Sequence, residues 1–334
     1  MAPSSLLRAP RVALGALALA LALLVAGCGG DDDDGSGGSA GGEQIAQRTT
    51  FPSASGKTFA ELRKGLGAGP VLAPTVSILK PGENRYGFAL FDRARKQLSA
   101  DDAAVYVAPT SGGPVEGPFY AVAESLTVAP PYQSQTVQND PDTARSIYVA
   151  RIRLKKPGTY QVMGVVKRDG RLIATDPAPA QVTKDDPVPD VGEKAPRIDT
   201  PTVESVGGDV KQIDTRVPPG SMHEDNFADA LGKRPILLLF ATPALCQSRV
   251  CGPVVDIAEQ VKASHEGDTA FIHMEIYNEN ELEKGFRPQV AAYKLPTEPW
   301  AFAVDRQGKV AARLEGAYSP HELNEAVKAA EEGK

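Results

Sequence analysis

The hydrophobic pattern of this chain changes once along its length, near residue 190, and that change restricts the folds it can adopt. Between about residues 71 and 183, apolar side chains recur at every second position, as in Tyr148, Ala150, Ile152 and Leu154. Alternation of this kind is typical of strands with one buried face. Beyond residue 190 the alternation gives way to continuous apolar runs and to helical spacing. The sequence therefore predicts an all-β domain followed by an α/β domain.

The first of these regions is expected to be an antiparallel β-sandwich. About seven short strands are separated by turns rich in glycine and proline, a pattern typical of immunoglobulin-like domains. The tripeptide Arg168-Asp169-Gly170 lies between two apolar runs and predicts a tight hairpin. Gly158–Val162 resembles the late strand of many bacterial immunoglobulin-like modules. The region has no cysteine, and the only tryptophan, Trp300, lies outside it, so the resemblance is one of architecture.

The second region alternates strands with helices. Ile236–Phe240 is a continuous apolar run, as expected for a strand buried on both faces of a sheet. A helix with one apolar stripe should follow, since Val254, Ile257, Ala258 and Val261 have i, i+3, i+4, i+7 spacing. With a helix before the first strand, the expected order is αβαβαββα. Its remaining elements are strands at 269–276, 300–305 and 309–314, a helix at 279–293, and a last helix after the capping box Ser319–Glu322.

The N-terminus has the features of an export signal. Arg8 and Arg11 precede a short apolar segment, residues 12–26, which ends at Val-Ala-Gly-Cys28. This ending resembles the bacterial lipobox, which implies that the signal peptide, residues 1–27, is removed and that Cys28 carries the lipid. We therefore expect an extracytoplasmic protein that is lipid-anchored to the bacterial cell membrane through Cys28.

Composition sets the remaining boundaries. The Gly-, Ser- and Asp-rich stretch after Cys28 cannot form a core, so a disordered tether is expected there. The net charge of −6 argues against nucleic acid as a partner, and the absence of a phosphate-binding loop or zinc spacing predicts no cofactor.

The expected divisions are a tether at 28–57, a short helix and linker at 58–70, the sandwich at 71–183, a Pro-rich linker at 184–222 and the α/β domain at 223–332, with its entry segment from 190.

Two cysteines lie just after the apolar run that ends at Phe240. Cys246 and Cys251 form a Cys-x4-Cys pair between a buried strand and its helix. That position, together with the element order, resembles the thioredoxin superfamily over residues 190–332. Three motifs carry the resemblance: Val191–Pro196, Phe240–Cys246 and Thr297–Trp300.

The resemblance implies an activity and a site. The protein would exchange thiols and disulfides with exported proteins, with one of Cys246 and Cys251 attacking and the other resolving the mixed disulfide. Pro299 corresponds to the cis-proline that faces the cysteines in this superfamily. Leu239 stands where thioredoxins have a buried aspartate that accepts a proton.

The spacing of the pair departs from the Cys-x-x-Cys of thioredoxins. On an ideal helix, residues five apart are about 8.6 Å apart, beyond the limit of about 7 Å for a disulfide. The pair can close only if part of the segment is not helical, and Pro253 suits a helix that starts near Gly252. The nucleophile stays open at this point, because the distance from Phe240 favours Cys246, whereas Gly252-Pro253 favours Cys251.

Three alternatives compete with thiol–disulfide exchange. Some peroxiredoxins use Cys-x4-Cys, but Thr242 lies one residue too far from Cys246 for their motif. Copper chaperones of the Sco type add a histidine to two cysteines; His273 and His321 are the weak candidates, each with a structural interpretation as a packed or a surface residue. Met222-His223 is interpreted as the end of the linker. A binding or scaffold lipoprotein with a structural Cys246–Cys251 disulfide is the third alternative.

Overall fold

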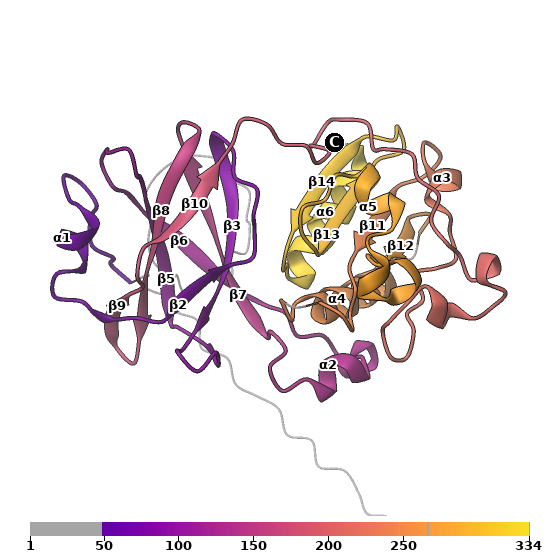
Figure 1. The fold of residues 1–334 in the computed structure, drawn as a ribbon, viewed down its shortest axis with the longest axis horizontal. Helices are drawn as coiled ribbons and strands as arrows, with labels where there is room; N and C mark the ends of the chain where they lie inside the picture. The colour runs from indigo at the N-terminus through magenta and orange to yellow at the C-terminus, as the bar shows by residue number, and fades with distance from the viewer. Residues whose placement is uncertain (1–48, 247, 266, 334) are drawn as a thin grey trace, which may run out of the picture. The chain divides into compact units, whose positions relative to one another are not determined.

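The computed structural model describes residues 49–246, 248–265 and 267–333, and within them lie a β-sandwich and an α/β domain (Figure 1). The expected signal peptide, Cys28 and the expected tether as far as residue 48 lie outside the described residues. Within the described part of the chain, no helix is both long enough and apolar enough to cross a membrane.

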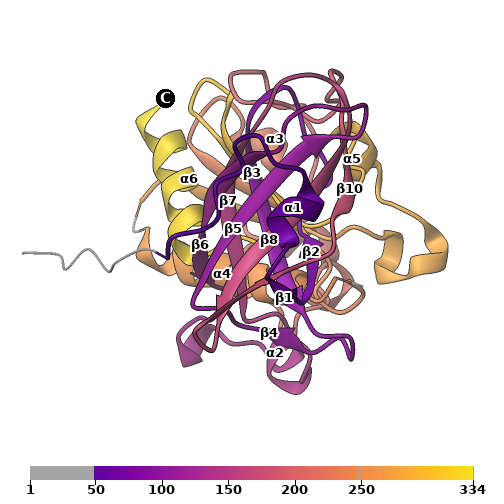
Figure 2. The same ribbon diagram turned by 90° about the vertical axis from the view of Figure 1, so that its left-hand side faces the viewer.

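The sandwich has two layers joined by one shared strand. The layer β7-β3-β2 faces the layer β9-β8-β5, and β6 pairs with both β5 and β7. The strands are β1 (Gly67–Ala68), β2 (Val71–Pro74), β3 (Gly82–Phe91), β4 (Gln97–Leu98), β5 (Asp102–Pro109), β6 (Glu116–Ser125), β7 (Ser146–Leu154), β8 (Gly158–Arg168), β9 (Arg171–Ala174) and β10 (Ala178–Val182). Figure 2 shows these strands from the side that carries α1 (Phe59–Arg63).

The core of the sandwich follows the alternation in the sequence. Tyr148, Ala150, Ile152 and Leu154 point into one cluster with side chains of the opposite layer, because alternate residues of a strand share a face. The immunoglobulin-like sandwich is therefore present. The strands outnumber the seven expected, since two-residue strands such as β1 and β4 are too short to show a period.

Two short sequence patterns in this region also form the structures that they predict, a hairpin turn and a capped helix. Asp169 and Gly170 both have positive φ, 50° and 73°, as the two-residue turn between β8 and β9 requires. Thr58 caps α1, and its hydroxyl accepts a hydrogen bond from the Glu61 backbone N–H while the Glu61 carboxylate accepts one from the Thr58 N–H. The short helix expected near residue 58 is therefore formed.

The α/β domain is built on a four-stranded sheet with the order β12-β11-β13-β14. β11 pairs with β12 in parallel and with β13 antiparallel, and β14 continues the antiparallel side. This is the thioredoxin-like arrangement, a β-α-β unit followed by a β-hairpin and a helix. The strands are β11 (Ile236–Phe240), β12 (Ala270–Met274), β13 (Trp300–Val304) and β14 (Val310–Glu315).

Helices cover both faces of this sheet. Side chains of α4 and α6 share one core cluster with Leu237 and Leu239, and those of α3 and α5 share the other with Ile236, Leu238 and Phe240. β11 is thus buried on both faces, as its continuous apolar sequence predicts. The helices are α3 (Phe227–Ala230), α4 (Cys251–Ser264), α5 (Pro288–Ala292) and α6 (Pro320–Glu332).

The helix expected over residues 279–293 is wrong for most of its length. The structure has two 3₁₀ turns, η4 (Asn278–Asn280) and η5 (Leu282–Lys284), before α5 begins at Pro288. Glu279 and Gly285 have positive φ, 52° and 69°, which ends any regular helix at those positions. Proline lacks the N–H that a helix interior needs, so Pro288 is accepted only in the first turn of α5.

The Pro-rich segment 184–222 packs against the α/β domain. It contains the 3₁₀ turns η2 (Glu204–Val206) and η3 (Val210–Gln212), and buries Val188, Asp214 and Arg216. Met222 and His223 at its end are 0% and 1% exposed. The interpretation of Met222-His223 as a mere linker end is therefore wrong, and both residues belong to the interior.

The sandwich and the α/β domain contact each other through polar groups and a shared core. Between β6 and β7 the chain forms η1 (Pro130–Tyr132) and α2 (Gln135–Asn139), and Ser134 in this crossover donates its backbone N–H to Asp256 of α4, at 2.8 Å. Asp256 also forms a buried ion pair with Arg216, at 2.9 Å. Leu126 and Ile147 of the sandwich join the core cluster that contains Cys251.

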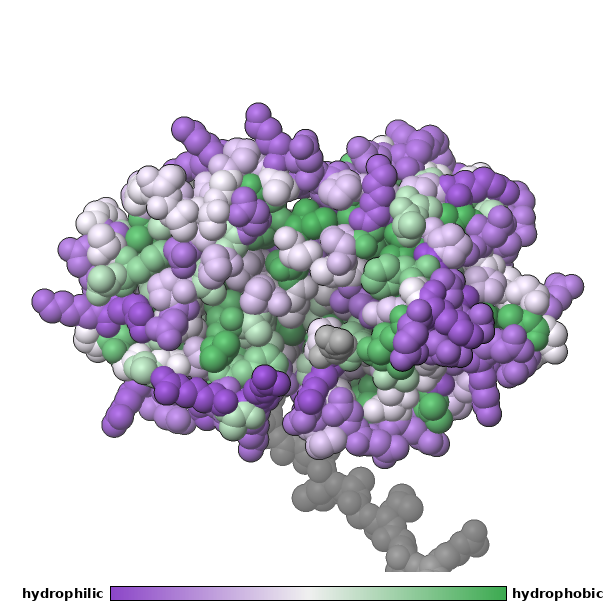
Figure 3. All heavy atoms as spheres, viewed as in Figure 1, coloured by the Kyte–Doolittle hydropathy of each residue, from purple (hydrophilic) through white to green (hydrophobic). Residues whose placement is uncertain are grey.

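The surface of the protein is mixed in character. On the face shown in Figure 3, hydrophilic residues cover most of the area, and apolar residues form separate patches between them. Apolar side chains that stay exposed are found in both domains: Val71, Tyr120, Val122, Val191, Val217, Leu282 and Phe286.

Candidate functional site

Cys246 and Cys251 are joined in a disulfide. Their Cα atoms are 6.0 Å apart, within the range that a disulfide spans. Closure is possible because α4 begins only at Cys251, and Cys246 lies in the loop between β11 and α4. The expectation that a late helix start permits closure is confirmed, with the helix beginning one residue before Gly252.

The two cysteines differ in exposure to solvent. Cys251 is 0% exposed and packs in the core cluster with Leu239 and Val254, whereas Cys246 is partly exposed. Cys246 Sγ lies 3.1 Å from the hydroxyl of Ser248. Cys251 is the first residue of a helix of 14 residues, and a helix N-terminus favours a thiolate. Of the two cysteines, Cys246 is therefore the more exposed to an incoming sulfur, and Cys251 is suited to leave or to resolve.

Glu298 places a carboxyl group beside the buried sulfur. Its Oε2 is 3.6 Å from Cys251 Sγ and accepts a hydrogen bond from the Thr242 backbone N–H, at 2.9 Å. The peptide bond between Glu298 and Pro299 is cis, as the resemblance implied for this proline. Sequence reasoning treated Glu298 only as part of a motif; a carboxylate directly before the proline that opens a strand was the signal that could have identified it.

The environment of Glu298 disfavours its charged form. Burial is the main cause that raises the pKa of Glu298 to about 7. The Thr242 hydrogen bond and His273 act against this increase, and the nearby Glu275 carboxylate adds to it. Tyr277 responds to the same group, since burial and the Glu298 charge raise the pKa of its hydroxyl. A carboxyl group with a pKa near neutrality beside a reactive sulfur is suited to exchange a proton with it.

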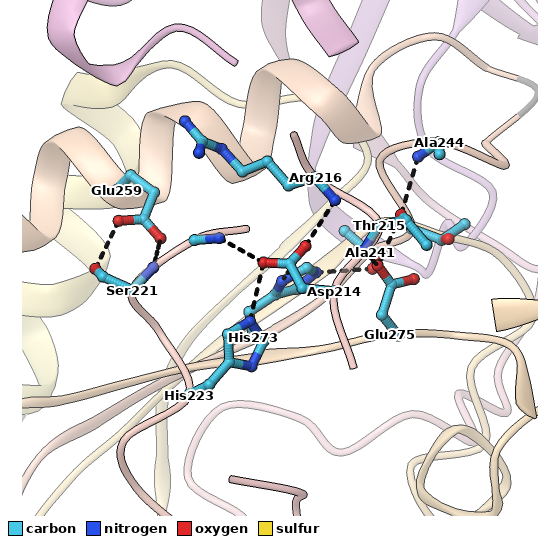
Figure 4. A network of polar contacts seen from close by, with 12 residues as sticks. Asp214, Thr215, Arg216, Ser221, His223, Ala241, Ala244, Glu259, His273 and Glu275 are labelled. Atoms are coloured by element: carbon cyan, nitrogen blue, oxygen red, sulfur yellow. Dashed lines mark hydrogen bonds and ion pairs between the residues drawn. The ribbon is translucent and has the colours of Figure 1, made fainter. Parts of the chain in front are cut away.

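A second polar cluster lies behind the site, at the end of β12 (Figure 4). His223 Nε2 is 3.0 Å from Asp214 Oδ2, and His273 Nδ1 is 3.7 Å from Asp214 Oδ1. His273 Nε2 contacts the carbonyl oxygen of Ala241, at 2.9 Å, which links the cluster to the loop after β11. All three side chains are buried. Sequence reasoning placed His273 correctly in a packed strand but missed its partners, since Asp214 and His223 come from the segment assigned to a linker.

The charges in this cluster stabilise each other. Although burial disfavours the charged form of His273, the Asp214 carboxylate outweighs burial and raises the pKa of the imidazole to about 9. The pKa of Asp214 is correspondingly held well below its usual range by His273 and His223, against the effect of burial. Backbone N–H groups of Arg216 and Gly220 also donate to Asp214. The cluster is thus a buried imidazolium–carboxylate pair.

Two groups of described residues bring three potential metal-ligand atoms within 4.8 Å of one another. One is Asp214, His223 and His273, joined by the His223–Asp214 hydrogen bond and the longer His273–Asp214 ion pair. The other is Cys246, Cys251 and Glu298, whose sulfurs are bonded to each other. Neither copper candidate, His273 or the exposed His321, joins the sulfurs in such a group among the described residues.

A groove of about 320 Å³ runs beside the disulfide. The sandwich contributes Ala73, Val76 and Phe91, and the α/β domain contributes Val250, Thr297 and Glu298. Ser248, in contact with Cys246 Sγ, also lines it. The groove is therefore lined by Glu298 and by residues of the loop between the two cysteines.

Comparison with known proteins gives similarity to solved structures that include the two described here. No protein-family model matches the chain, and no curated protein matches it in sequence. A thioredoxin-family thiol:disulfide interchange protein from Chlorobium tepidum TLS is 16% identical, with a TM-score of 0.28, covering 41% of this chain and 94% of that one. The Lin-41 filamin domain is 15% identical, with a TM-score of 0.20, covering 35% of this chain and 100% of that one. The fold is established by the strand order and register of the chain itself.

Proposed function

We propose that this protein exchanges thiols and disulfides with exported proteins through Cys246 and Cys251. The observation that carries the proposal is the asymmetric disulfide: Cys246 is partly exposed, and Cys251 is buried at the start of α4. An exchange site needs one sulfur that a partner can reach and a second that resolves the intermediate. The groove beside Cys246 offers room for a segment of the partner.

The reaction that reduces a partner has two steps. The Cys246 thiolate attacks one sulfur of the partner's disulfide, which forms a mixed disulfide and releases the other partner sulfur as a thiolate. The Cys251 thiolate then attacks Cys246 Sγ, breaks the mixed disulfide and releases the second partner thiol. Two electrons pass to the partner, and the Cys246–Cys251 disulfide is formed.

The location of the protein is part of the same proposal. A lipid on Cys28 would hold the exchange domain outside the cytoplasm, at the bacterial cell membrane, where exported proteins carry disulfides. The lipobox-like ending of residues 25–28 supports this location. Expression in bacteria with labelled palmitate should label the wild-type protein and the Cys246→Ser variant equally. The Cys28→Ser variant should stay unlabelled, and label on that variant would contradict lipidation at Cys28.

The exchange activity is tested with single cysteine variants and insulin as the disulfide substrate. The wild-type protein, with dithiothreitol as reductant, should accelerate insulin reduction. Cys246→Ser should abolish the acceleration because it removes the accessible sulfur. Cys251→Ser, reduced beforehand and then mixed with insulin after dithiothreitol is removed, should accumulate a covalent adduct through Cys246, visible on a non-reducing gel. If both variants accelerated the reaction as the wild type does, the proposal would fail.

The second candidate is a scaffold lipoprotein with a permanent disulfide. The complete burial of Cys251 in a core cluster shared by both domains favours it. A redox titration separates the two candidates, since structural disulfides have potentials below about −300 mV and labile ones have higher potentials.

A further inference from the structure

We propose that Glu298 is a catalytic residue that donates a proton to the Cys251 sulfur when the disulfide opens and accepts it back when the disulfide forms. This inference rests on the proposed exchange function and adds a proton carrier to it. Leu239, a residue of β11 in the same core cluster as Cys251, is apolar and cannot exchange a proton with the sulfur.

The contact geometry supports a direct transfer. Glu298 Oε2 lies 3.6 Å from Cys251 Sγ, and the Thr242 backbone N–H holds the same oxygen at 2.9 Å. In the disulfide, Cys251 Sγ has no hydrogen, so a proton at this contact can come only from the carboxyl group. In the dithiol, the Cys251 S–H can donate to the Glu298 carboxylate through the same contact. One pair of atoms therefore serves both oxidation states.

Burial makes a proton carrier necessary at Cys251. The residue is 0% exposed, so its sulfur is out of contact with solvent. An ionised group without a partner is strongly disfavoured inside a protein. The N-terminus of α4 lowers this cost, and protonation by an adjacent acid removes the charge. Glu298 is the carboxyl group that the structure places at hydrogen-bonding distance from this sulfur.

Opening of the disulfide moves one electron pair and one proton to Cys251. A thiolate attacks Cys246 Sγ, a new S–S bond forms to Cys246, and the Cys246–Cys251 bond breaks. The electron pair of the broken bond goes to Cys251 Sγ, which takes the proton of the Glu298 carboxyl group and leaves a carboxylate. In the opposite direction, the Cys251 thiol returns its proton to Glu298 as it attacks Cys246. The incoming thiolate is the reductant, and the disulfide is the oxidant.

Burial and the charged groups around Glu298 together set the pKa of its carboxyl group near neutrality. Burial and the Glu275 carboxylate raise the pKa of Glu298, and His273 lowers it. Asp214 outweighs burial and raises the pKa of His273 to about 9, so the imidazole carries a positive charge. The groups that face Glu298 come from the end of β12 and the following loop, from β14 across the groove, and from α4: His273, Glu275, Tyr277, Glu315 and Cys251.

The test uses the oxidised full chain and dithiothreitol, so no protein partner is needed. The rate of disulfide reduction is measured from pH 5.5 to 9 and divided by the concentration of dithiothreitol thiolate. For the wild type, this normalised rate should fall as the pH rises through about 7, because Glu298 loses its proton. Glu298→Gln keeps the size of the side chain but has no acidic proton. Its normalised rate should be flat and roughly tenfold lower than that of the wild type at pH 6.

A neighbouring carboxylate provides the matched control. Glu315 lines the same groove, and burial raises the pKa of its carboxyl group as well, but it accepts hydrogen bonds from Ser77 rather than contacting sulfur. Glu315→Gln should keep the wild-type pH profile. If Glu298→Gln kept that profile, or Glu315→Gln lost it equally, the assignment of the proton to Glu298 would be overturned.

An independent readout follows the carboxyl group itself. Carbon NMR of labelled Glu298 should titrate near pH 7 in the oxidised protein, and its midpoint should move on reduction because a thiol replaces the disulfide sulfur. An unchanged midpoint would contradict direct contact. A protein that showed both effects with dithiothreitol but failed to reduce insulin would keep the proton assignment and lose the proposed function.

Discussion

Arg85 of the sandwich and Glu322 of α6 form a two-pronged ion pair between the two domains. Arg85 Nε and Nη2 lie 2.7 and 2.8 Å from the two carboxylate oxygens, and Nη2 also donates to the carbonyl oxygen of Ala317, at 2.8 Å. The side chains of Arg85 and Glu322 are only 11% and 14% exposed. Glu322 also closes the capping box of α6 with Ser319, so one carboxylate serves both the helix and the domain contact.

We expect Arg85→Ala to lower the free energy of unfolding by about 3 kcal/mol, since it leaves a largely buried carboxylate without its partner. Arg85→Lys should cost less, because one charge is retained without the two-pronged geometry. Urea denaturation measures both. Arg63→Ala is the control, because the Arg63–Asp176 pair is exposed and should contribute less than about 1 kcal/mol. Equal losses for Arg63→Ala and Arg85→Ala would show that the domain contact contributes little to stability.

The sequence predicts those parts of the fold that depend on neighbouring residues. Alternation identifies β7, the continuous run identifies β11, and the Ser319–Glu322 pattern identifies the start of α6. The late start of α4 follows from Pro253 together with the geometry of a disulfide. Each of these depends on a period or a cap that is contained within a short stretch of chain.

The rest of the site depends on contacts between distant segments. Glu298 acquires its role from Cys251, 47 residues earlier in the chain, and His273 from Asp214, in a segment whose prolines suggest a linker. No periodicity of apolar residues in the local sequence indicates such a pairing. The prediction of a helix at 279–293 is wrong for a different reason. Its apolar and charged residues suit a helix, but the positive φ values of Glu279 and Gly285 interrupt it.

Gly316 provides a sharper test of the domain contact. A Cβ added to Gly316 would lie 1.7 Å from the carbonyl oxygen of Thr75 in the sandwich, and the residue has a φ of +71°. Gly316→Ala should therefore destabilise the protein by more than about 2 kcal/mol, from overpacking and backbone strain together. Gly192→Ala isolates the strain, because Gly192 has a φ of +89° but open space around it. Thermal unfolding of the two variants gives the difference, and similar losses would argue against close contact at Gly316.

The disulfide should contribute modestly to stability. It closes a short loop, with its cysteines five positions apart, for which the chain-entropy relation gives about 2 kcal/mol. We expect the free energy of unfolding of the Cys246→Ser/Cys251→Ser double variant, measured by urea denaturation, to be lower than that of the wild type by that amount. Reduced wild-type protein is the control, since it lacks the bond but keeps both sulfurs. A loss above about 5 kcal/mol would exceed the usual range for disulfides and would favour the structural role.

The His273–Asp214 pair makes stability depend on pH in a defined direction. Asp214 raises the pKa of His273 to about 9 in the folded protein, above the usual histidine value of 6.5, so the folded state binds this proton more tightly than the unfolded state does. The stabilisation is therefore complete below pH 6.5 and is lost as the pH rises to about 9. The loss should be on the order of 3 kcal/mol. Asp214 acts in the opposite direction at low pH, since its pKa lies below that of the unfolded chain and its contribution falls as acid protonates it.

Urea denaturation between pH 5 and pH 9.5 measures this dependence. The wild type should lose stability from pH 6.5 upward, and His273→Gln should be less stable at pH 6 but lack most of the decline, because its side chain does not titrate. His321→Gln is the matched control, since His321 is exposed and should leave the wild-type curve intact. If His273→Gln showed the same decline as the wild type, another group would carry the pH dependence, and the buried imidazolium would have to be abandoned.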